Sequence, residues 1–425
     1  MAPLAPELRN RKPLDWGIRV ILALVAVAIG YTTVRHSVAM ALPERSLERA
    51  HELAPGDGRI AAELARRQFT VQSAEPVAQG VDGPTLAARL SKTERLAQQA
   101  LLRDPTAVPA ITTLGLIAQL RGDIRTARRM FDYSEALSRR DLVTQLWMIE
   151  DAVGSDDIPA ALRHYDTALR TRWGAWDLLF PVLAGASNDP AIGKDLVKLL
   201  ASRPTWADSF VSYLATNSSD PVATARLFDG LRRAGVPVSG QDQALVINAL
   251  LAKQPAAAWE YYASVRAGAD RRWSRDPDFK ALLEQASQLD WVAASSETGL
   301  SASIQRDGQG AVFDFFAPAS LGGALLQQIQ FLPPGHYMLS GRSSGINQPV
   351  ESQPYWILTC TDNGRELGRV AVPNSDQAGG AFAGSLVVPA DCATQYLGLI
   401  ARASSAQEGL TGQILRVQLR PAPQR

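Results

Sequence analysis

The chain contains little histidine and little cysteine. Its 425 residues include four histidines and two cysteines. The histidines are His36, His51, His164 and His336. No pair of them has the His-Glu-x-x-His spacing of a helical metal site, and the cysteines form no Cys-x-x-Cys pair. The sequence therefore indicates neither a metal site nor a cofactor.

The motifs of common enzymes are also missing. There is no Gly-x-Ser-x-Gly nucleophile elbow and no glycine-rich phosphate loop. The acidic pairs, such as Glu150 with Asp151 and Asp156 with Asp157, are adjacent in sequence. A glycosidase instead needs two carboxyl groups that face each other across a cleft. We therefore predict that the protein is not an enzyme and has no catalytic residue.

An excess of charge of either sign is absent too. The 43 Lys and Arg residues balance the 42 Asp and Glu residues, so the formal net charge is +1. Nucleic-acid-binding domains concentrate positive charge on one face. Here basic pairs such as Arg271-Arg272 have acidic neighbours, and we interpret them as solvated helix faces. We expect no nucleic-acid partner.

Near the N-terminus, charge is missing from a long apolar run. Residues 20–34 carry no charged side chain, and Arg9, Arg11 and Lys12 precede them. Counted from Trp16, the stretch to Val34 has 19 residues, or about 28 Å of helix, which is close to the thickness of a hydrocarbon core, and the basic flank favours a cytoplasmic N-terminus. We predict a cytoplasmic tail over 1–16 and a transmembrane anchor over 17–36. The bulk of the chain would then be translocated and stay tethered to that membrane.

A cleaved signal peptide is the alternative to this anchor. Ala39-Met40-Ala41 has the small-x-small form of a cleavage site. Arg35 and His36 stand between that site and the apolar run, where charge is unfavourable for processing. The sequence favours the anchor and leaves the alternative open.

Two segments further along are alike at an offset of 34 residues. Residues 110–137 and 144–171 correspond, and Phe131 in the first is matched by Tyr165 in the second. This period is typical of stacked helical hairpins. The order Leu114-Gly115, Gly122-Asp123, Ala127 and Phe131 resembles the tetratricopeptide repeat. The resemblance implies a helical solenoid that docks partner proteins, here envelope proteins.

We expect this helical region to occupy residues 42–286. Within it, 70–83 is predicted to be a loop, because Ser73, Pro76 and glycines interrupt the pattern. Beyond residue 172, Asp189 and Asp220 each precede a proline and are predicted N-caps of further helices. A compact irregular helical domain is the alternative for this later part.

From residue 288 to 425 the pattern changes to short strands. The predicted strands are 311–315, 326–331, 336–340, 355–360, 368–372, 384–388, 396–401 and 414–419. Asp362-Asn363-Gly364 predicts a hairpin turn. The fold class is therefore multi-domain α plus β: a transmembrane helix, a solenoid that resembles tetratricopeptide repeats, and an antiparallel, jelly-roll-like β-sandwich.

The two cysteines, Cys360 and Cys392, both lie in this strand region. An even number of cysteines in a translocated segment favours one disulfide. Closing a loop of about 33 residues would contribute roughly 3–4 kcal/mol in the chain-entropy estimate. Two separate buried thiols are the alternative.

Four aromatic residues of the strand region are candidates for ligand binding: Trp291, Tyr337, Tyr355 and Trp356. Sugars stack on exposed aromatic rings. Alternation along 355–360, however, puts Trp356, Leu358 and Cys360 on one face, which favours a core position. Both interpretations stay open for each residue, and we favour the core.

The segments around Leu289-Asp290-Trp291, 332–342 and 355–360, with Cys392 following, resemble a known kind of domain. They are similar to the carbohydrate-binding-like sandwich that ends membrane-anchored repeat proteins of bacterial exopolysaccharide systems. The resemblance implies a non-enzymatic envelope scaffold that binds a polysaccharide and assists its assembly or export. The alternatives are a polysaccharide-acting enzyme with a binding module and a purely structural assembly factor.

The anchor and the signal peptide predict different products in the cell. We expect a C-terminally tagged chain to stay in the membrane fraction at its full size, because the apolar run is retained. Immunoblotting of membrane and soluble fractions measures this. A shortened, soluble product would contradict the anchor.

Overall fold

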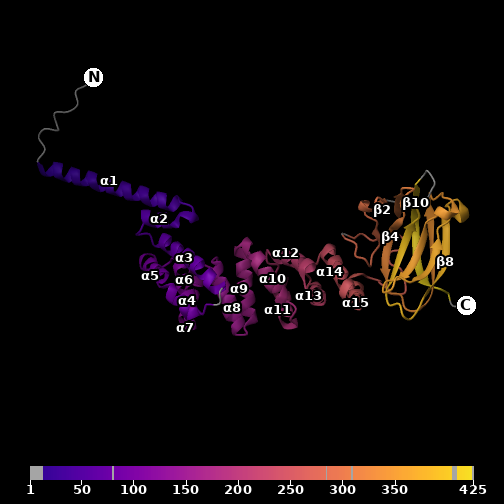
Figure 1. The fold of residues 1–425 in the computed structure, drawn as a ribbon, viewed down its shortest axis with the longest axis horizontal. Helices are drawn as coiled ribbons and strands as arrows, with labels where there is room; N and C mark the ends of the chain where they lie inside the picture. Colours follow the sequence, from indigo (N-terminus) through magenta and orange to yellow (C-terminus); the bar gives the residue numbers. More distant parts are fainter. Residues whose placement is uncertain (1–12, 79–80, 284, 308–309, 404–408, 424–425) are drawn as a thin grey trace, which may run out of the picture. The chain divides into compact units, whose positions relative to one another are not determined.

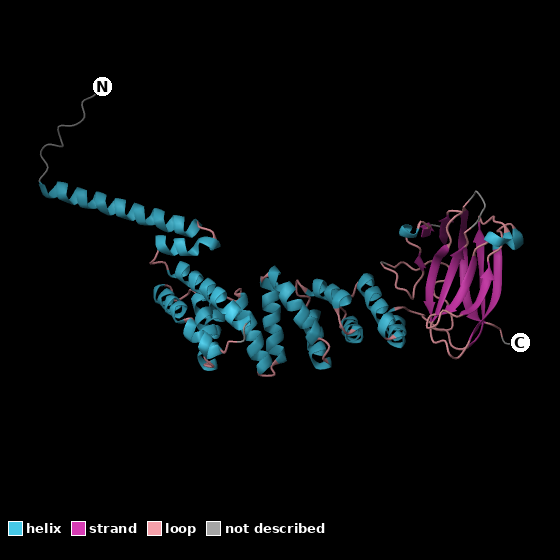
Figure 2. Ribbon diagram, in the orientation of Figure 1, coloured by secondary structure: helices cyan, strands magenta, loops and turns pink. Residues whose placement is uncertain are grey.

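The computed structural model describes residues 13–78, 81–283, 285–307, 310–403 and 409–423. These residues form fifteen α-helices followed by two antiparallel sheets (Figures 1 and 2). The chain divides into two compact units, Met1–Leu179 and Phe180–Arg425. The predicted multi-domain α plus β fold is confirmed.

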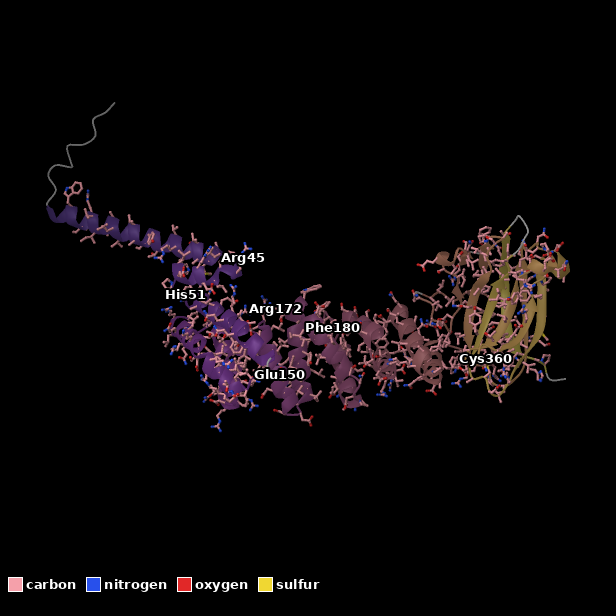
Figure 3. All side chains as sticks on the ribbon, in the orientation of Figure 1. Arg45, His51, Glu150, Arg172, Phe180 and Cys360 are labelled. Carbon is pink, nitrogen blue, oxygen red and sulfur yellow. A yellow bond between two sulfur atoms is a disulfide. The ribbon has the colours of Figure 1, made fainter. Side chains whose placement is uncertain are left out.

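The first helix, α1 (Pro13–Ala41), contains the predicted transmembrane segment. Its stretch Trp16–Ala41 is long and apolar enough to cross a membrane, with a mean hydropathy of 2.0. Side chains project from it along its length (Figure 3), and Leu24 and Val27 are exposed. The helix is a candidate membrane span or signal sequence. Residues 1–12, with the predicted basic flank and most of the cytoplasmic tail, lie outside the described residues.

The rest of the first unit is helical. Its helices are α2 (Leu47–Leu53), α3 (Gly58–Ala78), α4 (Gly83–Arg89), α5 (Ser91–Arg103), α6 (Val108–Leu120), α7 (Ile124–Leu137), α8 (Leu142–Gly154) and α9 (Ile158–Thr171). The two similar segments of the sequence are the hairpins α6–α7 and α8–α9. Gly115 packs against Phe131, where a Cβ would lie 2.8 Å from the ring. The Phe131 ring also stacks on Trp147, with the centroids 4.5 Å apart.

The predicted loop over residues 70–83 is largely wrong, because α3 continues to Ala78. The hydroxyl of Thr70 donates to the carbonyl of Arg66, four residues earlier, at 3.1 Å. The hydroxyl of Ser73 donates to the carbonyl of Thr70 at 3.4 Å. Such bonds satisfy polar side chains inside a helix, so neither residue ends it.

Helices continue from the boundary of the two units into the second. They are α10 (Trp176–Ala186), α11 (Pro190–Ala201), α12 (Ala207–Asn217), α13 (Pro221–Arg233), α14 (Gly240–Lys253) and α15 (Pro255–Val265). The predicted N-caps are confirmed. Asp189 accepts a hydrogen bond from the amide of Ala191 at 2.7 Å, and Asp220 accepts one from Val222 at 2.9 Å. A proline occupies the first turn of each helix, where no amide donor is needed.

The last α-helix of the described residues ends at Val265, so the prediction of helix up to residue 286 is wrong. Gly268, Asp276 and Phe279 have φ angles of 75°, 49° and 56°. This left-handed conformation cannot continue a right-handed helix. The chain instead runs along the sandwich, and the amide of Ser274 donates to the carbonyl of Leu419 at 3.0 Å.

The sandwich contains two five-stranded sheets among the described residues, with strand orders β1-β4-β9-β6-β7 and β2-β3-β10-β5-β8. The strands are β1 (Val292–Ala293), β2 (Ser301–Asp307), β3 (Gly310–Ala317), β4 (Gly323–Gln330), β5 (Gly335–Ser344), β6 (Tyr355–Cys360), β7 (Glu366–Ala371), β8 (Ala381–Val388), β9 (Gln395–Ala401) and β10 (Leu410–Pro421). Every pairing is antiparallel. Each of the eight predicted strands overlaps one of these; β1 and β2 were not predicted. Asp362-Asn363-Gly364 lies between the paired strands β6 and β7, and Gly364 has a φ of 68°.

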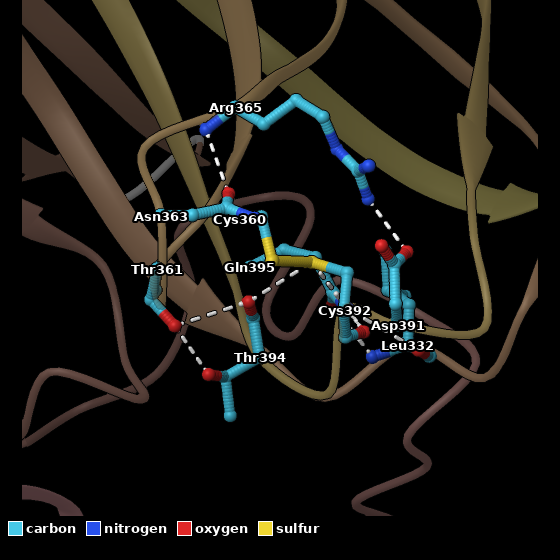
Figure 4. Close-up of a disulfide and its surroundings, with 9 residues drawn as sticks. All are labelled: Leu332, Cys360, Thr361, Asn363, Arg365, Asp391, Cys392, Thr394 and Gln395. Atoms are coloured by element: carbon cyan, nitrogen blue, oxygen red, sulfur yellow. Dashed lines mark hydrogen bonds and ion pairs between the residues drawn. A yellow bond between two sulfur atoms is a disulfide. The ribbon is translucent and has the colours of Figure 1, made fainter.

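The predicted disulfide joins Cys360 at the end of β6 to Cys392 just before β9, with 5.7 Å between the Cα atoms (Figure 4). Gln395 holds the same corner. Its amide nitrogen donates to the carbonyl of Cys392 at 2.7 Å, and its oxygen accepts from the amide of Leu332 at 2.9 Å. Both cysteines are buried.

The segment between α15 and β1 belongs to the core of the sandwich. The Phe279 side chain is fully buried in the cluster that also holds Trp291 and Phe313. A backbone hydrogen bond also joins this segment to β10: the amide of Val417 donates to the carbonyl of Pro277 at 3.0 Å. The folded sandwich therefore needs residues well before 288.

This predicts that a fragment 269–425 unfolds cooperatively and that a fragment 288–425 melts at a lower temperature or without a transition. Losing a buried phenylalanine alone costs about 3–5 kcal/mol. Circular dichroism during heating measures the effect. In fragment 269–425, Phe279→Ala should lower the melting temperature, whereas Lys280→Ala, at an exposed neighbour, should not. Equal melting of the two fragments would contradict this boundary.

Candidate functional site

Arg275 is a buried arginine on the segment that connects α15 to β1. Its Nε donates to the carbonyl of Leu289 at 2.8 Å, and its Nη1 donates to Oε1 of Gln330 at 3.1 Å. Its Nη2 donates to the carbonyl of Ile329. Its own amide donates to Oε1 of Gln328 at 3.0 Å. These bonds fix the connecting segment to β4.

The same guanidinium contacts α15. Its central carbon lies 5.6 Å from the ring centroid of Trp259 and 5.7 Å from that of Tyr262. Trp259 in turn packs on Phe331, just after β4, at 5.7 Å. Burial lowers the pKa of Arg275 to about 10, which still leaves the group charged at neutral pH. Cation–π contacts and hydrogen bonds of one side chain thus join the last helix to the sandwich.

A second buried polar group, Asp290, lies next to this arginine. Its Oδ1 accepts from the hydroxyl of Tyr262 at 2.8 Å. Its Oδ2 accepts from the amide and the hydroxyl of Ser287, at 2.9 and 2.7 Å. Burial, and then the nearby negative charge of Asp290, raise the pKa of Tyr262. The tyrosine therefore stays protonated and donates to the carboxylate.

An open cavity of about 500 Å³ lies beside this network. Arg266, just after α15, lines it together with Trp273 and Asp290. Nε and Nη2 of Arg266 are buried and have no hydrogen-bond partner among the described residues. Oδ1 of Asp290 is 3.9 Å from that Nε, which is beyond hydrogen-bond distance. An unsatisfied buried donor costs about 1–3 kcal/mol, so these two nitrogens need acceptor oxygens that the described residues do not provide.

The other lining groups define what kind of ligand fits. Arg266 and Arg275 are balanced by three carboxylates, those of Asp270, Asp276 and Asp290. Asp270 is already paired with Arg272 at 2.7 Å, and the hydrogen bonds from that residue lower the pKa of the Asp270 carboxyl. The cavity therefore has no strong net charge.

Trp273 and Gln418 also line the cavity. Trp273 is partly exposed, so its apolar ring is accessible from the cavity. Gln418 adds an amide that donates and accepts. An aromatic ring beside a few convergent polar groups suits a neutral ligand rich in hydroxyls. Among the described residues, no three His, Cys, Asp or Glu side chains are grouped to hold a metal ion.

Three of the four predicted ligand-binding aromatics lie in the core instead. Trp291, Tyr337 and Trp356 are 4, 3 and 1% exposed. Trp291 and Trp356 contact each other at 5.7 Å, edge to face. A ring that stacks on a sugar must be accessible, so the binding interpretation is wrong for these three residues. The core interpretation is the one that fits them.

The fourth candidate, Tyr355, is only partly buried, at the start of β6. The guanidinium carbon of Arg369 lies 4.1 Å from its ring centroid, and that of Arg402 lies 4.8 Å away. These contacts compete with a sugar for the ring. Tyr355 and Trp356 are consecutive in β6, so their side chains lie on opposite faces of the sheet.

The residues that line the cavity were missed by sequence reasoning. Arg266 and Trp273 fall inside the range 42–286 that was predicted to be helical. Gly268 and the pair Asp276-Pro277 are the signals that could have indicated a break there. The contacts of Ser274 and Pro277 with β10 could not be predicted, because these residues lie far in sequence from the predicted strands.

Comparison with known proteins gives no family. No protein-family model matches the chain, and no curated protein matches it. A solved structure described as "CBM4 structure and function" is 16% identical, with a TM-score of 0.27, over 35% of this chain and 99% of the other.

Two larger proteins resemble smaller parts of the chain. One is a glycosylation-associated protein complex from Streptococcus agalactiae, 12% identical with a TM-score of 0.20, over 28% of this chain and 38% of the other. The other is the enzymatically active domain of tailspike protein 4 of bacteriophage CBA120, 13% identical with a TM-score of 0.22, over 32% and 20%. Values this low show no shared activity.

The network around Arg275 predicts a large effect of its removal. Arg275→Ala should lower the free energy of unfolding by about 3–5 kcal/mol, because buried acceptors lose their only charged partner. Urea unfolding of the detergent-solubilised chain, followed by tryptophan fluorescence, measures this. Arg420→Ala, at an exposed arginine of β10, is the control and should change little. Equal stability of the two variants would contradict the role given to Arg275.

Proposed function

We propose that this chain is a non-enzymatic envelope protein of a bacterium that binds a saccharide in the cavity between α15 and the sandwich. The observation that carries this proposal is the pair of buried, unpartnered donors of Arg266 beside Trp273. Hydroxyl oxygens of a sugar would accept from the guanidinium, while the apolar face of the sugar ring would pack on the indole.

The remainder of the chain supports a tethered role. The apolar helix α1 is suited to hold the protein in the inner membrane, with the bulk in the periplasm. The stacked hairpins α6–α7 and α8–α9 offer a surface on which envelope proteins can dock. A role in exopolysaccharide assembly or export follows from the resemblance of the sandwich segments described above.

A glycan array of bacterial surface polysaccharides tests the proposal on the full chain in detergent or nanodiscs. We expect a neutral saccharide to bind, and Arg266→Gln to weaken its binding about 10- to 100-fold. That range corresponds to the loss of charge-assisted hydrogen bonds worth roughly 1.5–3 kcal/mol. Trp273→Ala should weaken binding about tenfold, because an aromatic contact is lost.

Two matched variants serve as controls. Trp173→Ala removes an exposed tryptophan of the first unit, and Arg420→Gln removes an exposed arginine of β10. Neither should change binding. Absence of any bound glycan would instead favour a purely structural assembly factor. Shortening of the glycan during incubation would contradict the non-enzymatic role.

A further inference from the structure

A groove of about 380 Å³ lies between α11 and α13 in the second unit. Its floor is apolar, with Val197 on α11 and the buried Leu227 on α13. Gly230 lies between them, and a Cβ there would be 2.9 Å from Cγ2 of Val197. A glycine inside a helix costs about 1 kcal/mol relative to alanine, so its position here is explained by the close approach of the helices.

The rim of this groove is basic. It carries three basic side chains and no acidic one: Lys194, Arg226 and Arg233. The acids on these helices are paired elsewhere, because Asp195 lies 2.6 Å from Lys198 and Asp229 lies 2.9 Å from Arg232. In the described part of the chain, no carboxylate forms an ion pair with any of the three rim cations. The groove thus combines an apolar floor with uncompensated positive charge.

The spacing of the rim residues indicates the shape of the partner. Arg226 and Arg233 are seven residues apart on α13, which is about 10.5 Å along the helix axis. Leu227 and Gly230 lie between these two arginines in the sequence and line the groove. A second helix laid along α13 presents residues i and i+7 at the same separation, with i+3 and i+4 on the same face.

We infer that this groove docks an acidic amphipathic helix of a partner protein. Carboxylates two turns apart pair with Arg226 and Arg233, and a third reaches Lys194 on the opposite rim. Apolar side chains between the carboxylates pack on Val197 and Leu227. This inference deepens the docking part of the proposed function and is independent of the saccharide cavity.

The test uses the full chain in nanodiscs of neutral lipid and a labelled helical peptide of repeating Glu-Gln-Ala-Leu-Leu-Gln-Ala heptads. We expect saturable binding by fluorescence anisotropy, weakened by salt. Charge reversal with Arg226→Glu and Arg233→Glu should weaken it at least about tenfold. Lys198→Glu, on the same helix as Lys194 but outside the groove, should leave binding unchanged.

A charge swap separates docking from misfolding. The doubly reversed variant should bind a peptide in which lysine replaces each glutamate, and it should still bind the saccharide. The inference is overturned if the acidic peptide does not bind. It is also overturned if Lys198→Glu weakens peptide binding as much as the reversal of Arg226 and Arg233 does. It is also overturned if substitution of the three rim cations weakens binding of the chain to phosphatidylglycerol vesicles but does not weaken binding of the acidic peptide. Each of these results leaves the saccharide measurement intact.

Discussion

One buried side chain, that of Arg275, determines how the second unit is built. Its hydrogen bonds reach Leu289, Ile329 and Gln330, and its charge lies against the rings of Trp259 and Tyr262. A buried cation without such partners would be strongly destabilising. The last helix, the connecting segment and β4 therefore have to keep one arrangement. This constraint is what allows a helical segment to continue into a sandwich without a flexible linker.

The same constraint produces the cavity. Oδ1 of Asp290 accepts from the hydroxyl of Tyr262, whose ring also contacts Arg275. The neighbouring Arg266 is left with donors that no residue of the described chain accepts. Most buried polar groups in proteins have a hydrogen-bond partner, so these donors of Arg266 need an explanation. The groove between α11 and α13 has a different chemistry, with uncompensated positive charge over an apolar floor. The second unit thus offers one surface suited to hydroxyl groups and another suited to an acidic helix.

Periodicity and turn residues predicted much of this fold. The eight predicted strands, the N-caps Asp189 and Asp220, and the disulfide follow from local patterns and are present. Residues 266–286 were not predicted to leave the helical region, because only Gly268 and the pair Asp276-Pro277 indicate a break there and the contact of Pro277 with Val417 is not local. The contacts of Ser274 with Leu419 join residues far apart in sequence. Arg275 could not be distinguished from a surface arginine, and alternation along 355–360 favoured a core position for Trp356 without excluding a binding platform.

We propose that a saccharide binds where the last helix meets the sandwich. Hydrogen–deuterium exchange of the full chain, with and without the saccharide selected on the glycan array, tests this most directly. We expect slower exchange in peptides that cover residues 262–276 and β10. Protection confined to β6, β7 and β9, around Tyr355, would contradict it.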